Sequence, residues 1–210
     1  MNTTTPLAER LRPRSFDDYV GQQHLVGNDG SLQKLIKRGR PTSIVFWGPP
    51  GCGKTTLAKL YIKSFTLPVE TIHATTSATA DFRRIIESAE SAPLFCRPML
   101  VWIDEVHRLT RPQQDLLLQS LENGTLVLVA ATTENPSFQL SPALLSRVQV
   151  MILKPLENNN LHKLLERIET TYGRLPLTPE AKNQLVEWAA GDARSFLNWI
   201  EQLQRETPEL

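Results

Sequence analysis

The 210-residue sequence is poor in cysteine, in net charge and in long apolar runs. Its two cysteines, Cys52 and Cys96, are too few for a disulfide framework or a four-cysteine zinc site, and they suit a reducing compartment. The 23 basic and 22 acidic residues leave a net charge of +1, which excludes a strongly basic nucleic-acid coat but allows a local patch. No uncharged apolar run reaches the roughly 18 residues of a membrane span. The N-terminus lacks the form of a signal peptide, so we expect a cytoplasmic protein without membrane contact.

Short apolar runs alternate with helical patterns over most of the chain. The predicted strands are 43–47, 69–73, 99–103, 126–131 and 149–153. Residues 54–65 and 81–91 have helical spacing, and Thr110 with Gln113 predicts a capping box at the start of a further helix. Strands separated by helices predict an α/β fold, here a parallel five-stranded sheet with helices on both faces.

After Pro155 the pattern is helical only. Its three apolar stripes lie at 161–168, 181–188 and 196–203. Three short amphipathic helices after an α/β unit predict a small three-helix lid domain. We therefore expect an α/β domain at 1–154 and a helical lid at 155–210. Trp188 and Trp199 lie on these stripes and are predicted to belong to the lid core.

The sharpest motif is Gly48–Thr55, which reads Gly-Pro-Pro-Gly-Cys-Gly-Lys-Thr. It follows a predicted strand and opens a predicted helix, the context in which the phosphate-loop motif binds a nucleotide. Backbone N–H groups and the positive end of the helix face the phosphates in such a loop. We expect Lys54 to neutralise the β- and γ-phosphates of ATP, and the Thr55 hydroxyl to coordinate Mg²⁺. The other loop residues predicted to bind the nucleotide are Pro50, Gly51, Cys52, Gly53 and Thr56.

A second motif is the apolar run Leu100–Ile103, which ends in Asp104 and Glu105. A buried parallel strand delivers these acids to the carboxyl edge of the sheet, beside the phosphate loop. Asp104 is predicted to hold Mg²⁺ through water, and Glu105 to orient and polarise the attacking water. The alternative is a strand that ends in solvated acids, which the presence of the phosphate loop disfavours.

Four further residues have two interpretations each. Thr133 follows a strand and either bonds the attacking water or the γ-phosphate, or belongs to a simple turn. Arg147 ends a short helix as a solvated charge or as an arginine finger for a neighbouring subunit. Arg194 opens the last helix and faces the nucleotide or the solvent. For Cys52, a filler role is favoured over a thiol activated by the helix N-terminus.

Two weaker signals complete the candidates. His107 follows Glu105 closely, and we expect a surface or supporting histidine rather than a catalytic one. Five arginines could form a DNA-facing patch, although the balanced charge favours a solvated face. They are Arg83, Arg84, Arg97, Arg108 and Arg111.

In their order along the chain, these motifs resemble the P-loop NTPases of the AAA+ class. More specifically, the sequence resembles the replication-associated recombination protein A family, which includes the eukaryotic Werner-helicase-interacting ATPase. The segments that carry this resemblance are 12–22, 47–56, 103–108, 131–138 and 143–147. The stretch Thr-Thr-Glu-Asn-Pro-Ser-Phe is far more specific than the phosphate loop.

The resemblance implies a DNA-stimulated ATPase that uses ATP and Mg²⁺, acts at stalled replication forks and remodels protein–DNA assemblies. It implies that Val20 and Gly21 lie by the adenine, and that Thr133 is the first sensor, with the adjacent Thr132 as an alternative. It further implies that Arg147 acts across a subunit interface and that Arg194 is the second sensor, on the lid. The implied partners are forked or junction DNA and single-stranded-DNA-binding protein, in the nucleoid.

Family members form homotetramers through a helical domain beyond the lid, whereas this sequence ends at Leu210, so the resemblance leaves oligomerisation open. Two other functions stay open as well. One is a subunit like those of clamp loaders or Holliday-junction motors. The other is a nucleotide-binding interaction module with little turnover, which the presence of Lys54, Thr55, Asp104 and Glu105 disfavours.

Overall fold

The computed structural model describes residues 5–92 and 98–206. Its sheet has five parallel strands, as the sequence predicted, and the structure adds their order, β2-β3-β4-β1-β5. The strands are β1 (Ile44–Trp47), β2 (Val69–His73), β3 (Met99–Asp104), β4 (Leu126–Thr132) and β5 (Gln149–Ile152). Each lies within one residue of its predicted bounds, and the inner strands β3 and β4 are nearly continuous apolar runs because both of their faces are buried.

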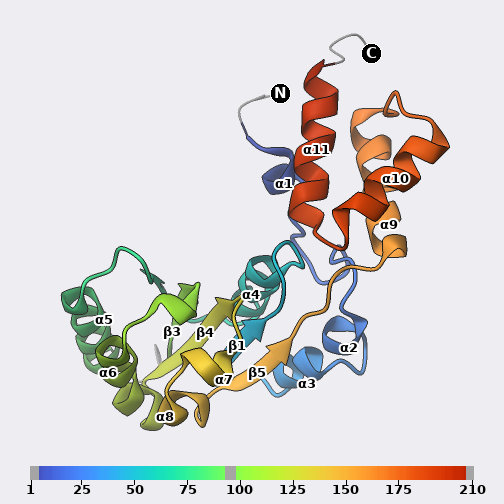
Figure 1. Ribbon diagram of the computed structural model, residues 1–210. Helices are drawn as coiled ribbons and strands as arrows, with labels where there is room; N and C mark the ends of the chain where they lie inside the picture. Colours follow the sequence, from blue (N-terminus) through green and yellow to red (C-terminus); the bar gives the residue numbers. More distant parts are fainter. Residues whose placement is uncertain (1–4, 93–97, 207–210) are drawn as a thin grey trace.

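Two apolar clusters cover the two faces of the sheet. Along β3, Val101 and Ile103 belong to one cluster and Trp102 to the other, since successive side chains of a strand point to opposite faces. The first cluster includes side chains of α5 (Thr79–Ser91) and α6 (Arg111–Glu122), and the second those of α3 (Ser31–Lys37) and α4 (Lys54–Lys63). The predicted α/β class is therefore confirmed, with helices on both faces (Figure 1).

Side-chain caps mark the start of several helices. The backbone N–H of Thr110 donates to Gln113 Oε1 at 2.9 Å, as in the predicted capping box. Ser141 and Thr178 each accept a hydrogen bond from the backbone N–H three residues on. They cap α8 (Pro142–Leu145) and α10 (Pro179–Ala189). Each of these two helices has proline in its first turn, where a missing N–H costs nothing.

The helical part consists of α9 (Asn158–Tyr172), α10 and α11 (Ala193–Glu206), which we call the lid. Its apolar cluster also takes Leu7 and Leu11 from the N-terminal region, where α1 (Leu7–Arg10) packs beside α11 (Figure 1). The division at 154 and 155 stays a prediction, and to it the structure adds this N-terminal contribution. The remaining short helices are α2 (Gln23–Val26), η2 (Val106–Arg108) and α7 (Pro136–Gln139). Over the described ranges, no helix has the length and apolarity needed to cross a membrane.

The prediction that Trp188 belongs to the lid core is wrong. Its side chain is 71% exposed, whereas Leu185, Val186 and Ala189 of the same helix are buried. Successive residues of a helix are rotated by about 100°. Leu185, Val186 and Ala189 therefore share one buried face, and Trp188 points away from its centre. Trp199 is half-buried and packs against the lid cluster, as expected.

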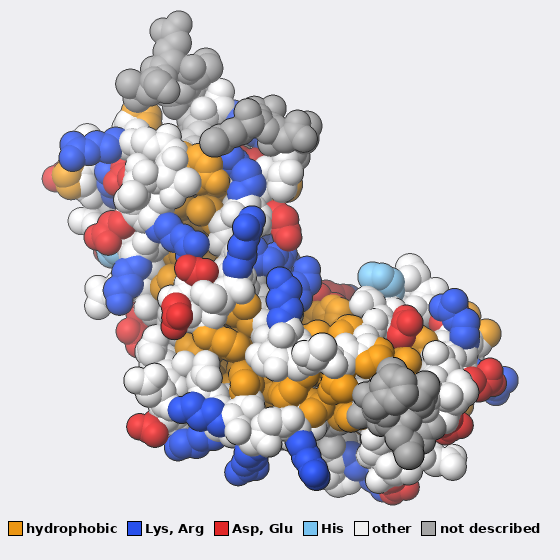
Figure 2. Space-filling view, turned by 180° about the vertical axis from the view of Figure 1, so that it is seen from behind, with side chains coloured by type: hydrophobic (Ala, Val, Ile, Leu, Met, Phe, Trp, Pro, Cys, Tyr) orange, Lys and Arg blue, Asp and Glu red, His pale blue; other side chains and the backbone are white. Residues whose placement is uncertain are grey.

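A narrow junction connects the α/β part to the lid. The side chain of Gln22, which has a positive φ of 52°, bonds both the carbonyl (2.6 Å) and the N–H (3.0 Å) of Lys154. Leu156 N–H then donates to the Gly191 carbonyl of the lid at 3.1 Å. Seen from behind, Lys and Arg side chains gather along this junction (Figure 2).

Candidate functional site

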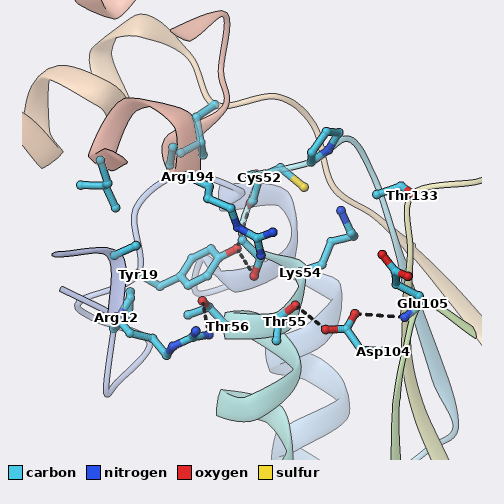
Figure 3. A pocket seen from close by; sticks show the side chains of 18 of the residues that line it. Arg12, Tyr19, Cys52, Lys54, Thr55, Thr56, Asp104, Glu105, Thr133 and Arg194 are labelled. Carbon is cyan, nitrogen blue, oxygen red and sulfur yellow. Dashed lines mark hydrogen bonds between the residues drawn. The ribbon is translucent and has the colours of Figure 1, made fainter. Parts of the chain in front are cut away.

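A cavity of about 450 Å³ lies at the carboxyl edge of the sheet, between the phosphate loop, the strand ends and the lid. Parallel strands place their following loops together at this edge, where open α/β sheets bind ligands. All residues predicted to contact nucleotide, metal or attacking water line it, apart from Gly21 and Arg147. They come from separate parts of the chain, among them the phosphate loop, the end of β3 and the start of α11 (Figure 3).

The phosphate loop depends on glycine at two positions. Gly51 and Gly53 have φ values of +66° and +98°, a conformation that other residues rarely adopt. Both are also crowded: a Cβ on Gly53 would collide with the Tyr19 hydroxyl, and one on Gly51 with the Asp192 carboxylate. These close approaches hold the loop between the N-terminal region and the start of α11.

The ammonium of Lys54 is buried within the loop. Only 9% of the residue is exposed, and Nζ donates to the carbonyls of Gly48 (2.9 Å) and Pro49 (2.7 Å). Desolvation lowers the pKa of Lys54, and the nearby Cys52 and Asp104 partly oppose this shift. Lys54 points toward the same space as Glu105 and Thr133 (Figure 3). The loop therefore holds a cationic donor at the place where phosphates would enter.

The oxygens of Thr55 and Asp104 make a fitting partial site for Mg²⁺. Thr55 Oγ1 donates to Asp104 Oδ2 at 3.2 Å, and the backbone N–H of Glu105 donates to Oδ1 at 3.1 Å. A Mg²⁺ bound directly by the Thr55 hydroxyl would keep water ligands, and Asp104, beside that hydroxyl, is placed to bind such a water. The described residues hold no cluster of three or more His, Cys, Asp or Glu side chains suited to a metal. Mg²⁺ keeps waters and phosphate oxygens among its ligands, so few protein oxygens are enough to hold it.

Glu105 has an unusual backbone. Its φ is +52°, so the chain leaves β3 in the left-handed region and enters η2. Such a conformation costs free energy in a residue with a side chain, and it is frequent at functional sites. The carboxylate is exposed to the cavity, with Arg108 Nε 3.7 Å away.

Thr132 and Thr133 differ sharply in their surroundings. Thr132 is 2% exposed, and its hydroxyl bonds the backbone of Glu134 and the ring of His107. Thr133 is exposed and lines the cavity. The geometry therefore favours Thr133 for the first-sensor role, which stays a prediction. The His107 side chain is only 5% exposed, so it is an interior histidine and not a surface one.

Arg194 and Arg147 lie in different places. Arg194 extends from the first turn of α11 toward the phosphate loop (Figure 3). Arg147 lies outside the cavity, where it donates to the Ala143 carbonyl at 2.6 Å and pairs with Glu122. Gly21 also lies outside it and backs onto the lid.

Sequence reasoning missed Tyr19 and Arg12, which line the cavity and bond the phosphate loop and the start of α4. The Tyr19 hydroxyl lies 3.3 Å and 3.2 Å from the carbonyls of Cys52 and Gly53, and desolvation raises the pKa of Tyr19 well above its usual range. Arg12 Nη1 donates to Thr56 Oγ1 at 3.3 Å. Both belong to the N-terminal stretch that carries part of the resemblance, but no spacing rule places that stretch over the phosphate loop.

Cys52 is 1% exposed. Desolvation raises the pKa of its thiol, and the charge of Lys54 offsets this only in part. A protonated thiol is a poor nucleophile, so the structure agrees with a filler role.

The predicted arginine patch is described in part, because Arg97 lies outside the described residues. The other four arginines are exposed, in agreement with a solvated face. Contact with DNA through them stays untested.

Comparison with known proteins agrees with this geometry. The model of the ATPase family associated with various cellular activities (AAA) matches residues 44–156. Replication-associated recombination protein A of Haemophilus influenzae is 41% identical over 206 residues, which cover 95% of this chain and 46% of that protein. ATPase WRNIP1 of Dictyostelium discoideum is 38% identical over 201 residues, which cover 93% of this chain and 23% of that protein. The chain thus spans less than half the length of these relatives.

The fold recurs among solved structures. RuvB of Thermotoga maritima, described as a Holliday junction branch migration motor, superimposes with a TM-score of 0.77 over 94% of this chain and 66% of that one. At 24% identity this similarity shows the fold alone. Family match, relatives and fold together confirm the resemblance found in the sequence: the chain belongs to the AAA family of ATPases and is similar to replication-associated recombination protein A.

Proposed function

We propose that this chain binds Mg²⁺ and ATP between its α/β part and its lid, and that it hydrolyses the ATP. The observation that carries the proposal is the convergence of Lys54, Thr55, Asp104 and Glu105 on one cavity. A cation, two oxygen ligands and a carboxylate exposed to the cavity are the groups that phosphoryl transfer to water requires. This placement depends on the path of the whole sheet, so a chance motif match would not produce it.

Each region of the cavity has a part in binding. The phosphate loop and Lys54 hold the phosphates, while Thr55 and Asp104 hold Mg²⁺, which neutralises the charge of the phosphates. The adenine lies by Val20, on an apolar wall to which Leu164 and Leu197 of the lid contribute. Arg194 adds a positive charge from the lid, so the bound nucleotide contacts both parts of the molecule.

In the hydrolysis step, Glu105 orients and polarises the attacking water. A general base contributes about 10²–10⁴-fold when it is within hydrogen-bond reach of its proton. Thr133, on the neighbouring strand end, bonds the same water or the γ-phosphate. Both side chains face the space in front of Lys54 (Figure 3), which supports this division of roles.

The work done by hydrolysis is proposed to be a change in the angle of the lid. The backbone N–H of Ala193 donates to the Gly51 carbonyl at 3.3 Å, so α11 contacts the phosphate loop directly. By similarity to replication-associated recombination protein A, the motion remodels protein–DNA assemblies in replication-fork maintenance and recombination. Forked or junction DNA, single-stranded-DNA-binding protein and further copies of the chain are the proposed partners, in the nucleoid. The basic side chains along the junction support an anionic partner (Figure 2).

The test is ATP turnover by the purified chain with Mg²⁺, in the wild type and in Glu105→Gln. The variant keeps the size of the side chain and loses the base, so turnover falls about 100-fold or more while ATP still binds. Glu87→Gln, on the exposed face of α5, is the matched control and keeps wild-type turnover. Equal turnover in Glu105→Gln and in the wild type would remove the catalytic proposal.

A second candidate is a nucleotide-binding module with little turnover, which the position of Arg147 favours because this side chain lies outside its own cavity. A missing arginine finger costs about 10³–10⁵-fold in related phosphoryl-transfer systems. Light scattering with and without ATP separates the two: a strict monomer with negligible turnover favours the module. A clamp-loader-like or Holliday-junction-motor-like subunit would instead assemble and hydrolyse ATP.

A further inference from the structure

The imidazole of His107 lies between the turn that carries Glu105 and the turn that carries Thr133. It belongs to η2, and its side chain is 5% exposed. Nδ1 is 3.0 Å from Thr132 Oγ1, and Nε2 is 3.5 Å from Glu134 Oε1. One side chain therefore reaches both neighbours of Thr133 along the chain.

The hydrogen bonds of Thr132 assign the proton of the ring. The Thr132 hydroxyl donates to the Glu134 carbonyl at 3.1 Å and accepts from the Glu134 N–H at 3.0 Å. A hydroxyl has one proton, which is used here, so its remaining lone pair accepts from His107 Nδ1–H. The contact is thus a directed bond from η2 to the end of β4.

Apolar packing alone would not fix the relative position of the two turns. Val106 is fully buried in the apolar cluster beside β4, which sets the depth of η2. Hydrophobic contact is non-directional, so it tolerates sliding of one turn along the other. A hydrogen bond weakens steeply with distance and angle, so the His107–Thr132 bond resists that sliding.

We propose that His107 is a positioning residue, which fixes the distance between Glu105 and Thr133 across the cavity and so aligns the attacking water. The inference rests on the proposed function. Lys54 and Val20, which contact the phosphates and the adenine, lie on other elements, so His107 acts on turnover and not on nucleotide binding.

The kinetic test compares three substitutions of His107. A displacement of about 1 Å can cost about 10²-fold, so His107→Ala lowers kcat about 10- to 100-fold and leaves the Kd for ATP within about twofold. The amide of His107→Asn lies near the place of Nδ1 and can donate to Thr132, so this variant regains most of kcat. His107→Gln carries its amide farther out and does not. The control is His162→Ala, a half-buried histidine of α9, which keeps the wild-type kcat.

A purely structural histidine would give another pattern. His107→Ala would then lower kcat only in proportion to the folded fraction, as measured by thermal unfolding, and Asn would rescue no better than Gln. That result would overturn the proposal, as would a wild-type kcat in His107→Ala.

A second measurement needs no turnover. By NMR, the wild type shows a slowly exchanging Nδ1 proton for His107, and Thr132→Val loses it. If the wild type fails to hydrolyse ATP, the proposed function fails, and the His107 bridge is then judged on this resonance alone. Absence of the resonance in the wild type, or its persistence in Thr132→Val, would overturn the inference.

Discussion

At the residue scale, buried polar side chains satisfy the backbone carbonyls of the phosphate loop. Lys54 bonds two carbonyls at the start of the loop, and Tyr19 lies within reach of two at its end. Buried polar groups are nearly always paired, because an unpaired one loses its hydration without compensation. Removal of either side chain therefore changes the loop itself, and not only the contacts of that side chain.

Tyr19→Phe tests this support without a change in ring size. The Gly53 carbonyl keeps its bond from the Leu57 N–H (2.9 Å), whereas the Cys52 carbonyl loses the hydroxyl beside it, so the free energy of unfolding falls by about 1 kcal/mol and ATP binds a few-fold more weakly. Urea unfolding and a nucleotide titration measure the two effects. Tyr172→Phe, on the lid, is the control and changes neither. An unchanged ATP affinity in Tyr19→Phe would show that the loop does not need the hydroxyl.

The same variant changes the alkaline stability. Desolvation raises the pKa of Tyr19 above its ordinary value of 10.0, so the folded state keeps a proton that the unfolded state releases. The stability from this group is complete below about pH 10 and is lost as the pH rises further. As the pH rises above about 10, the free energy of unfolding therefore falls less steeply in Tyr19→Phe than in the wild type. Cys52 and Tyr61 have raised pKa values and add to the fall, and Lys54 has a lowered one and opposes it, but all three remain in both proteins.

How far sequence predicted the site follows from how local each signal is. Lys54, Thr55, Asp104 and Glu105 occupy two short segments whose chemistry depends on neighbouring residues only. Tyr19 reaches the loop through the path of the N-terminal region, which no periodicity encodes. The choice between Thr132 and Thr133 depends on which side chain faces the cavity. The turn at the end of β4 interrupts the alternation of the strand, so the sequence does not fix this.

At the element scale, the length of a segment decides whether it could be predicted. Four strands were predicted because each contains a short apolar run between turns, and β2 because its residues alternate like those of a strand. The α1 helix has four residues, too few to show a helical period, and it is held by packing on the lid, through Leu7 in the lid cluster and Arg10 over the ring of Tyr172. Trp188 shows a different failure. The apolar stripe at 181–188 was recognised, but Trp188 was assigned to its buried face and is exposed.

The contact between the phosphate loop and α11 leads to a prediction that compares two glycines. Gly51 and Gly124 have similar φ values, +66° and +72°, but a Cβ at Gly124 meets open space whereas one at Gly51 meets Asp192. Alanine in the left-handed region costs about 1–2 kcal/mol, so the free energy of unfolding of Gly124→Ala falls by about that amount. In Gly51→Ala the free energy of unfolding falls further, and ATP binds at least tenfold more weakly, because the start of α11 must move off the loop. Urea unfolding and nucleotide titration measure both effects. Equal losses of stability and of ATP affinity in the two variants would contradict the prediction.

At the scale of the whole molecule, two packed cores meet at a narrow junction beside the cavity proposed to bind nucleotide. The sheet with its helices forms one core, and the lid with α1 the other (Figure 1). Gln22 and Lys154 join the two chain segments that pass between them. A ligand that contacts both sides can therefore set the angle between the cores by its contacts alone.

Arg147 lies on the α/β part of the molecule, outside the cavity. A motion of the lid therefore does not bring it to the nucleotide of its own chain. If it serves a neighbouring copy, Lys54→Ala has an intact finger and a disabled cavity, and Arg147→Ala has the reverse. Each variant alone is nearly inactive, with a loss of about 10³-fold or more for Arg147→Ala. An equal mixture regains ATP turnover, and the specific activity of the wild type rises with protein concentration. Arg111→Ala, at an exposed arginine outside the cavity, is the control: mixed with Lys54→Ala it adds only its own activity. A mixture of the two inactive variants that equals the sum of their separate rates at every concentration would show that Arg147 does not act between subunits.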